Sequence, residues 1–173
     1  MVMKQLKRRV KGFTLAELIV VIAIIGILAG ILVPALIGYT KKAKFSAANA
    51  GAKSVLNAGM LACRETDVIK PIPVGLYTDT QSGLATTDPS DGSTGPFLDT
   101  TINGFVYKYA DNLENKVWAI YIQDDVVVAA CYAENTGTGI VGTYPTPNEE
   151  SHPLSDLNTF QEALSVAQGG SWT

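Results

Sequence analysis

The sequence predicts an α+β fold in which a long amino-terminal α-helix packs on a small antiparallel β-sheet. Three observations lead to this fold class: an apolar run over residues 13–37, an amphipathic stripe that continues to residue 63, and short strand-like segments after residue 103. The chain has 173 residues. This length suits one modest domain together with a membrane segment.

The apolar run has the length of a membrane-spanning helix. Glu17 is the only charged residue among the 25 residues from Phe13 to Ile37. As a helix this segment rises about 37 Å, and the hydrocarbon core of a bilayer is about 30 Å thick. Five lysines and arginines precede the run within residues 1–12, and Lys41, Lys42 and Lys44 follow it. The larger cluster predicts an amino terminus on the cytoplasmic side.

The charge distribution argues against several classes of function. Beyond residue 12 the chain carries eight cations and sixteen acids, a balance of −8, so no clustered cations predict a nucleic-acid site. His152 has no catalytic partner in the sequence, and the Asp124–Asp125 and Glu149–Glu150 pairs lack EF-hand spacing. The sequence therefore predicts a protein without enzymatic activity, metal or cofactor.

The helix is expected to continue from residue 38 to residue 63 as an amphipathic segment. Its small and apolar residues recur at spacings of three and four, which is typical of one helix face: Phe45, Ala48, Ala52, Val55, Leu56, Gly59 and Cys63. Because this stripe is rich in alanine and glycine, another element can pack close against it. We expect that element to be the sheet.

The remaining residues, 64–173, are expected to form a globular head. Residues 65–103 read as irregular, because proline, glycine and small polar residues punctuate them. Strands are predicted over Gly104–Ala110, Lys116–Ile122 and Val126–Ala133, joined by turns at Asp111–Asn112 and Asp124–Asp125, in a sheet of about three to four strands. Residues 137–153 again read as a loop. A last short helix carries Leu157, Phe160, Leu164 and Ala167 on one face, with Ser155 or Asp156 as its cap.

The two cysteines, Cys63 and Cys131, leave two alternatives open. They are too far apart in sequence for a CxxC motif. If the head is exported, a disulfide joining the helix end to the third predicted strand is possible. The other alternative is a pair of buried thiols that behave as small apolar side chains.

The segment from Lys11 to Glu17, Lys-Gly-Phe-Thr-Leu-Ala-Glu, stands directly before the apolar run and is preceded by the basic leader. This arrangement resembles the processing signal of type IV prepilins and pseudopilins. The resemblance covers roughly residues 4–45 and extends through the apolar run to Pro34. It implies that residues 1–12 are a leader, which a prepilin peptidase removes by cleavage between Gly12 and Phe13.

The resemblance also implies roles for single residues. The new amino group of Phe13 would be N-methylated, and Glu17 would pair with the Phe13 ammonium of a neighbouring subunit. Pro34 removes one helix hydrogen bond, so it is expected to kink or loosen the helix. Two buried opposite charges tolerate apolar surroundings only as a pair, so the pairing would set the register between subunits.

The function implied is that of a structural subunit of a type IV pilus. The precursor would be a single-pass protein of the bacterial cytoplasmic membrane, in contact with lipid, and the mature subunit would polymerise with itself into a surface filament. Twitching motility, adhesion, DNA uptake and aggregation stay open as the tasks of this filament. Its partners would be the peptidase, an assembly ATPase and platform proteins of the inner membrane. Two alternatives remain: a pseudopilin of a type II secretion or DNA-uptake machine, and a single-pass anchored binding or enzymatic domain.

Overall fold

The computed structural model describes residues 12–67, 72, 74–78, 99–135, 137, 139–152, 154 and 157–172. Residues 1–11 of the basic leader, most of the segment predicted as irregular, and the predicted caps Ser155 and Asp156 lie outside the described residues. The chain divides into two compact units, Met1–Thr40 and Lys41–Thr173. Helix α1, Leu15–Asp67, contributes to both units. The fold of the second unit is α+β, as predicted.

Within the described residues of the second unit, four antiparallel strands form one sheet in the order β1-β2-β3-β4. They are β1 Gly75–Thr78, β2 Val117–Gln123, β3 Val126–Ala133 and β4 Val141–Tyr144. The predictions for β2 and β3 are confirmed. Asp124 and Asp125, which join them, have φ of 52° and 60°. Two successive positive φ angles are those of the two-residue hairpin turn that matches strand twist.

Two of the strands lie in segments that were predicted to be irregular. β1 falls within residues 65–103, and β4 falls within residues 137–153. Each has only four residues, which include one glycine and one threonine, so neither shows a strong alternation of apolar and polar residues. Because such short strands depend on pairing with a longer neighbour, their local sequence gives little signal.

The strand predicted over Gly104–Ala110 is wrong, because residues 104–109 lie in helix α2, Thr100–Tyr109, and Ala110 is its C-cap. The side chain of Asp99 caps this helix and accepts hydrogen bonds from the backbone N–H groups of Thr101 at 2.8 Å and Ile102 at 3.2 Å. Ile102 and Val106, four residues apart, are buried on the core side of the helix. The alternating aromatic residues that suggested a strand are only partly buried.

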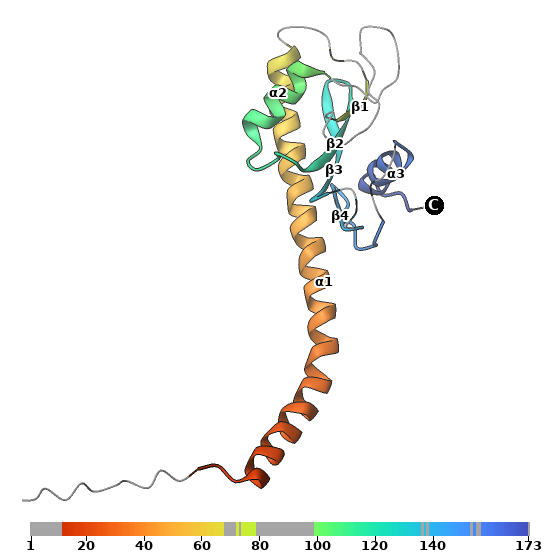
Figure 1. Ribbon diagram of the computed structural model, residues 1–173. Coiled ribbons are helices and arrows are strands. Elements are labelled where there is room, and N and C mark those ends of the chain that lie inside the picture. Colours follow the sequence, from red (N-terminus) through yellow and green to blue (C-terminus); the bar gives the residue numbers. More distant parts are fainter. Residues whose placement is uncertain are drawn as a thin grey trace, which may run out of the picture. The chain divides into compact units, whose positions relative to one another are not determined.

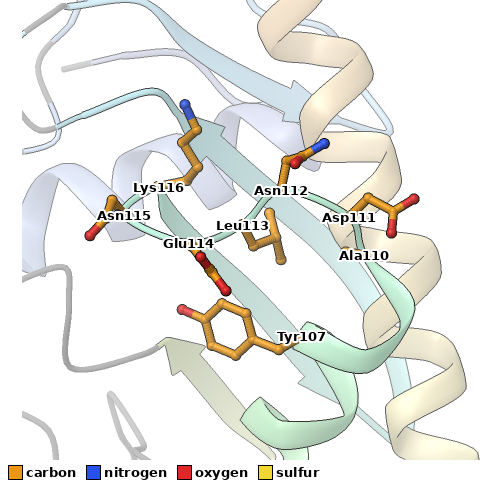
Figure 2. Close-up of a pocket in the computed structure, with 8 residues that line it drawn as sticks. All are labelled: Tyr107, Ala110, Asp111, Asn112, Leu113, Glu114, Asn115 and Lys116. Carbon is orange, nitrogen blue, oxygen red and sulfur yellow. The ribbon is translucent and has the colours of Figure 1, made fainter.

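α2 is followed by a turn-rich segment, residues 110–116, which leads into β2. A cavity of about 830 Å³ lies beside it, with Tyr107 of α2 on one side and the segment around Leu113 on the other (Figure 2). Asn112 and Asn115 both have φ of 60°, a backbone conformation that asparagine adopts more readily than most residues. This segment turns the chain from the helix into the sheet.

The sheet is covered on both faces within the second unit, by α1 and α2 on one side and α3, Leu157–Ala167, on the other (Figure 1). Side chains of β2 alternate between the two cores: Trp118, Ile120 and Ile122 pack with α1, whereas Val117 and Ala119 pack with α3. The predicted helix stripe from Phe45 to Cys63 is buried. The prediction of a short last helix is also confirmed.

Glycines allow α1 to approach the sheet closely. A Cβ atom at Gly142 of β4 would overlap the backbone carbonyl of Ala48 in α1. A Cβ atom at Gly59 would lie 3.0 Å from side-chain atoms of Ile120 and Val127. At Gly142 the backbone of the sheet therefore contacts the backbone of the helix, and at Gly59 the backbone of the helix contacts side chains of the sheet.

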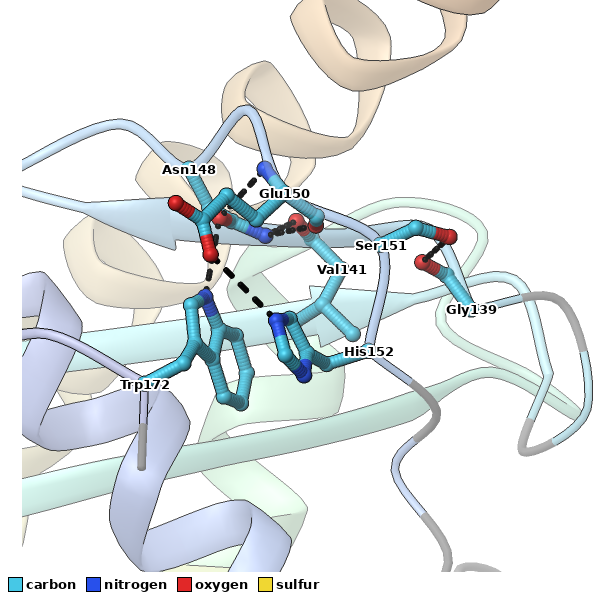
Figure 3. Close-up of polar contacts among 7 residues, drawn as sticks. All are labelled: Gly139, Val141, Asn148, Glu150, Ser151, His152 and Trp172. Atoms are coloured by element: carbon cyan, nitrogen blue, oxygen red, sulfur yellow. Dashed lines mark hydrogen bonds and ion pairs between the residues drawn. The ribbon is translucent and has the colours of Figure 1, made fainter.

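A polar network supplements this packing. Asn49 of α1 accepts from the backbone N–H groups of Thr143 at 2.8 Å and Asn148 at 3.1 Å, and donates to the Asn148 carbonyl at 2.9 Å. The buried side chain of Asn148 donates to the carbonyls of Val141 and Glu150, and accepts from the Glu150 N–H and the Trp172 indole (Figure 3). The hydrogen-bonding capacity of the Asn148 amide is thus used on both its oxygen and its nitrogen.

The disulfide alternative for Cys63 and Cys131 is wrong. The two sulfurs are not joined. Both residues are buried, but Cys63 belongs to the core between α1 and the sheet, and Cys131 belongs to the core beneath α3. The sheet itself separates them. Burial raises the pKa of the Cys131 thiol to about 12.

The contact at Gly142 yields a test of the helix–sheet packing. Replacing Gly142 with alanine is expected to lower the free energy of unfolding by about 1–3 kcal/mol or more, because the new methyl group overlaps the Ala48 backbone. Denaturant unfolding of the full chain in detergent measures the change, with the fully buried Trp118 as fluorescent reporter. Gly104→Ala is the control, since nothing lies within 4 Å of that position. An unchanged midpoint for Gly142→Ala would contradict the close approach.

The arrangement of the cysteines predicts their reactivity. In the folded protein neither thiol should react with an alkylating reagent, because both are buried and the pKa of Cys131 is high. After unfolding in denaturant, intact mass should show two alkylated thiols without any added reductant. Two additions that appear only after reduction would reveal a disulfide and contradict the structure.

Candidate assembly site at the amino-terminal helix

The first unit consists, in its described part, of residues 12–14 followed by the amino-terminal half of α1. Every residue from 12 to 40 is exposed, including large apolar side chains such as Ile31 and Leu32. The helix has a mean hydropathy of 3.0 over its most apolar eighteen-residue window, and none of that window is buried. Its length and composition suffice to cross a membrane. An apolar surface this large indicates contact with lipid or with another protein.

The predicted cleavage point lies just before the helix. Gly12 and Phe13 precede the first helical residue, Leu15, and the Phe13 side chain is 82% exposed. The backbone here has no intrahelical hydrogen bond to lose. A peptidase would therefore not have to unwind the helix in order to reach the bond between Gly12 and Phe13.

Thr14 and Glu17 form a capping box at the start of α1. The Glu17 carboxylate accepts hydrogen bonds from the Thr14 backbone N–H at 2.9 Å and from its hydroxyl at 2.8 Å. The Thr14 hydroxyl in turn accepts from the Glu17 N–H at 3.3 Å. The Thr14 carbonyl accepts the first helical hydrogen bond, from Leu18 at 3.2 Å. Thr14 is therefore the N-cap residue, and Glu17 completes the reciprocal arrangement.

The role of Thr14 was missing from the sequence predictions, although its signal was readable. A threonine followed three residues later by a glutamate, directly before an apolar run, is the sequence signature of a capping box. The box holds the Glu17 carboxylate at the helix amino terminus, where the helix dipole favours negative charge. The carboxylate is thus kept beside Phe13 at the end of the apolar surface.

A shallow groove of about 400 Å³ continues from this point along the helix. Its lining residues recur at helical spacing and are apolar except for the glutamate: Phe13, Ala16, Glu17, Val20 and Val21. The groove presents one carboxylate within an otherwise apolar surface. Such a surface suits a partner that is apolar and carries one matching cation.

Pro34 lies inside α1, which continues on both sides of it. Proline has no N–H to donate, so the carbonyl of Gly30 lacks its usual helical partner. The predicted kink or loosening of the helix at this residue stays a prediction.

The second unit offers little catalytic chemistry in its described part. The His152 ring stacks on Trp172 with ring centroids 4.2 Å apart, and its Nε2 lies 3.4 Å from the Glu150 carboxylate (Figure 3). This contact secures the carboxyl-terminal segment. Among the described residues, no three histidine, cysteine, aspartate or glutamate side chains are grouped so that they could share a metal ion.

Comparison with known proteins identifies the amino-terminal segment. Residues 7–33 match the model of the prokaryotic N-terminal methylation motif. The match includes Gly12, Phe13, Thr14 and Glu17, and it ends one residue before Pro34. No solved structure matches the chain.

The apolar helix and its capped start thus carry the methylation motif that marks a class of proteins with an amino-terminal hydrophobic helix. This motif is typical of type IV pilins and pseudopilins. Pilin-like proteins with this motif are generally structural rather than enzymatic.

Proposed function

We propose that this protein is the structural subunit of a type IV pilus filament. The observation that carries the proposal is the methylation motif on an exposed apolar helix whose first turn holds a single carboxylate. A prepilin peptidase removes residues 1–12 by cleavage between Gly12 and Phe13, and the new amino group of Phe13 is methylated. The subunits leave the membrane and polymerise through the helix that begins at Phe13.

The physical requirements of polymerisation support this proposal. The described helix between Leu15 and Thr40 has no protein cover of its own, so lipid must surround it before assembly and other subunits must surround it afterwards. Cleavage creates an ammonium group on Phe13, and methylation leaves it cationic. The groove along Phe13, Glu17 and Val20 offers apolar contact and the matching negative charge.

The pairing of Glu17 with the Phe13 ammonium of a neighbouring subunit would fix the register of the filament. Within an apolar helix bundle, a carboxylate without a cation costs several kcal/mol, on the order of 3–5 kcal/mol. A misplaced subunit would leave both charges uncompensated. The capping box favours the correct arrangement, because it holds the carboxylate at the helix start before a neighbour arrives.

Further parts of the proposal come from the motif rather than from the geometry. They include two kinds of partner, the assembly ATPase and the membrane platform proteins. They also include the division of the chain into a leader (1–12), a spanning segment (13–37), an amphipathic segment (38–63) and a head (64–173). A pseudopilin of a secretion or DNA-uptake machine shares the same amino-terminal features. Electron microscopy separates the two, because a pilin yields long surface fibres and a pseudopilin yields short assemblies within the envelope.

Processing of the precursor is the first test. Mass spectrometry of the protein from its host membrane, or from a host that supplies a prepilin peptidase, should show a mature chain that begins at methylated Phe13. Gly12→Val should block cleavage, since a branched side chain hinders close approach of the peptidase to the backbone. An intact Met1 terminus on the unmodified chain would contradict filament assembly and favour a single-pass anchored domain.

The registry role of Glu17 is the second test. Glu17→Ala as the only subunit should be cleaved normally but should lower filament yield by at least about tenfold, because the loss of one buried charge partner costs about 3–5 kcal/mol. Electron microscopy and sheared-filament assays measure the yield.

Thr14→Ala is the control for this variant, because it removes the capping hydroxyl and keeps the charge of Glu17. Loss of an N-cap costs only about 0.5–2 kcal/mol, so this control should retain more filaments than Glu17→Ala. Equal losses in the two variants would assign the effect to the helix cap instead of the intersubunit pair.

A further inference from the structure

A cleft of about 410 Å³ lies where α3 passes over the face of the sheet formed by β1 and β2. Its floor is apolar, because Leu76 of β1 and Leu164 of α3 are buried there. Its walls are polar and neutral: Tyr121 and Gln123 come from β2, Gln161 and Ser165 come from α3, and Gln168 comes from the turn directly after α3. Lipid contact and filament assembly, as proposed above, do not use this cleft.

The polar side chains of the cleft come from regular elements that align them. Gln161 and Ser165 are four residues apart, so they project from one face of α3. Gln168 lies in the turn directly after the helix, where its backbone N–H still donates to the Leu164 carbonyl at 3.2 Å. Tyr121 and Gln123 are two residues apart on β2 and point to the same face of the sheet. Tyr121 pairs directly with Leu76 across the strands. The lining is thus built on a sheet, a helix and the turn that ends this helix.

The glutamines of the cleft differ from the structural amides of this domain. Asn49 and Asn148 bond to backbone groups and connect elements of the fold. In the described part of the chain, the side chains of Gln123, Gln161 and Gln168 make no such bond, and all three are exposed. Each therefore offers an amide donor and an amide acceptor to a ligand.

The chemistry of the lining selects one kind of ligand. Among the described residues, no lysine, arginine, aspartate or glutamate lines the cleft, so they provide no charge attraction to an anion or a cation. Amides donate and accept at once, which matches the vicinal hydroxyl groups of a sugar. An aromatic ring such as that of Tyr121 provides a flat apolar surface with a polar edge. The volume falls within the range of about 300–1,000 Å³ typical of small-ligand sites.

We propose that the cleft between α3 and the β1–β2 edge of the sheet binds a neutral carbohydrate of one or two sugar rings. Gln161 and Gln168 donate to and accept from its hydroxyl groups, Ser165 adds a hydroxyl contact, and the Tyr121 ring packs against its apolar face. Such binding gives the head domain an affinity for glycan-bearing surfaces that is independent of filament assembly.

The test uses the full-length chain in a detergent without sugar groups, because a glycoside detergent would compete for the cleft. Neutral methyl glycosides of galactose, glucose, mannose and N-acetylglucosamine, and disaccharides that contain them, are titrated to millimolar concentrations. The side-chain amide signals of the ¹⁵N-labelled glutamines report binding by NMR. At least one sugar should produce saturable shifts at Gln161 and Gln168.

Gln161→Leu and Gln168→Leu should each weaken this binding about tenfold, since each leaves a sugar hydroxyl without a partner. Asn158→Leu is the matched control, because it replaces an exposed amide on the same helix outside the cleft. It should leave the affinity unchanged. Unaltered fluorescence of the buried Trp118 verifies that each variant is folded.

Three results would overturn the proposal. One is that no sugar of the panel produces saturable shifts. Another is equal binding by Gln161→Leu, Gln168→Leu and the unmodified chain, or an equal loss in Asn158→Leu. The third is saturable binding of a neutral serine- and glutamine-rich peptide when no sugar binds, which would make the cleft a peptide site beside edge strand β1.

Discussion

The close packing of α1 against the sheet is the constraint on which the second unit depends. At Gly142 the backbones of β4 and α1 are so close that a single methyl group has no room. The small residues of the helix stripe, such as Ala48 and Ala52, permit this approach, and the hydrogen bonds of Asn49 fix it to β4. With one face of the sheet covered by α1, the other is left for α3. The two cores and the alternation of β2 side chains follow from that division.

The two parts of α1 satisfy opposite requirements with the same secondary structure. From Lys41 onward the helix buries a narrow stripe of small residues and exposes polar ones, so its partner is the sheet of its own chain. From Leu15 to Thr40 it is apolar on all sides and entirely exposed, so its partners must be lipid or other chains. The single carboxylate at the start of the apolar part has a defined position through Thr14. A charge that is expensive in apolar surroundings is thereby kept at the helix end, where a cation can reach it.

The chemistry of the amino-terminal site was readable from the sequence because it is local. The motif, the apolar run and the capping pair Thr14 and Glu17 all lie within a few helical turns, and the match to the methylation motif agrees with them. The head was harder to predict where its elements depend on distant partners. β1 has four residues and pairs with β2, far away in the chain, whereas β4 has four residues and depends on pairing with the strand before it, β3. For α2, the cap by Asp99 and the burial of Ile102 and Val106 outweigh an alternating aromatic pattern.

The cysteines show most clearly which features the sequence does not predict and the tertiary structure determines. The sequence by itself determined the apolar helix, the strands β2 and β3, and their turn at Asp124 and Asp125. Continued from that turn, the register of Ile122 with Val127 would have placed Cys131 opposite Trp118, on the face that packs against α1. A bulge shifts the register by one residue, so Cys131 pairs with Ala119 and faces α3 instead. Because side chains alternate with a period of two, that one residue moves the thiol to the other side of the sheet from Cys63. No local pattern carries this information, since it is the packing of two cores that selects the face.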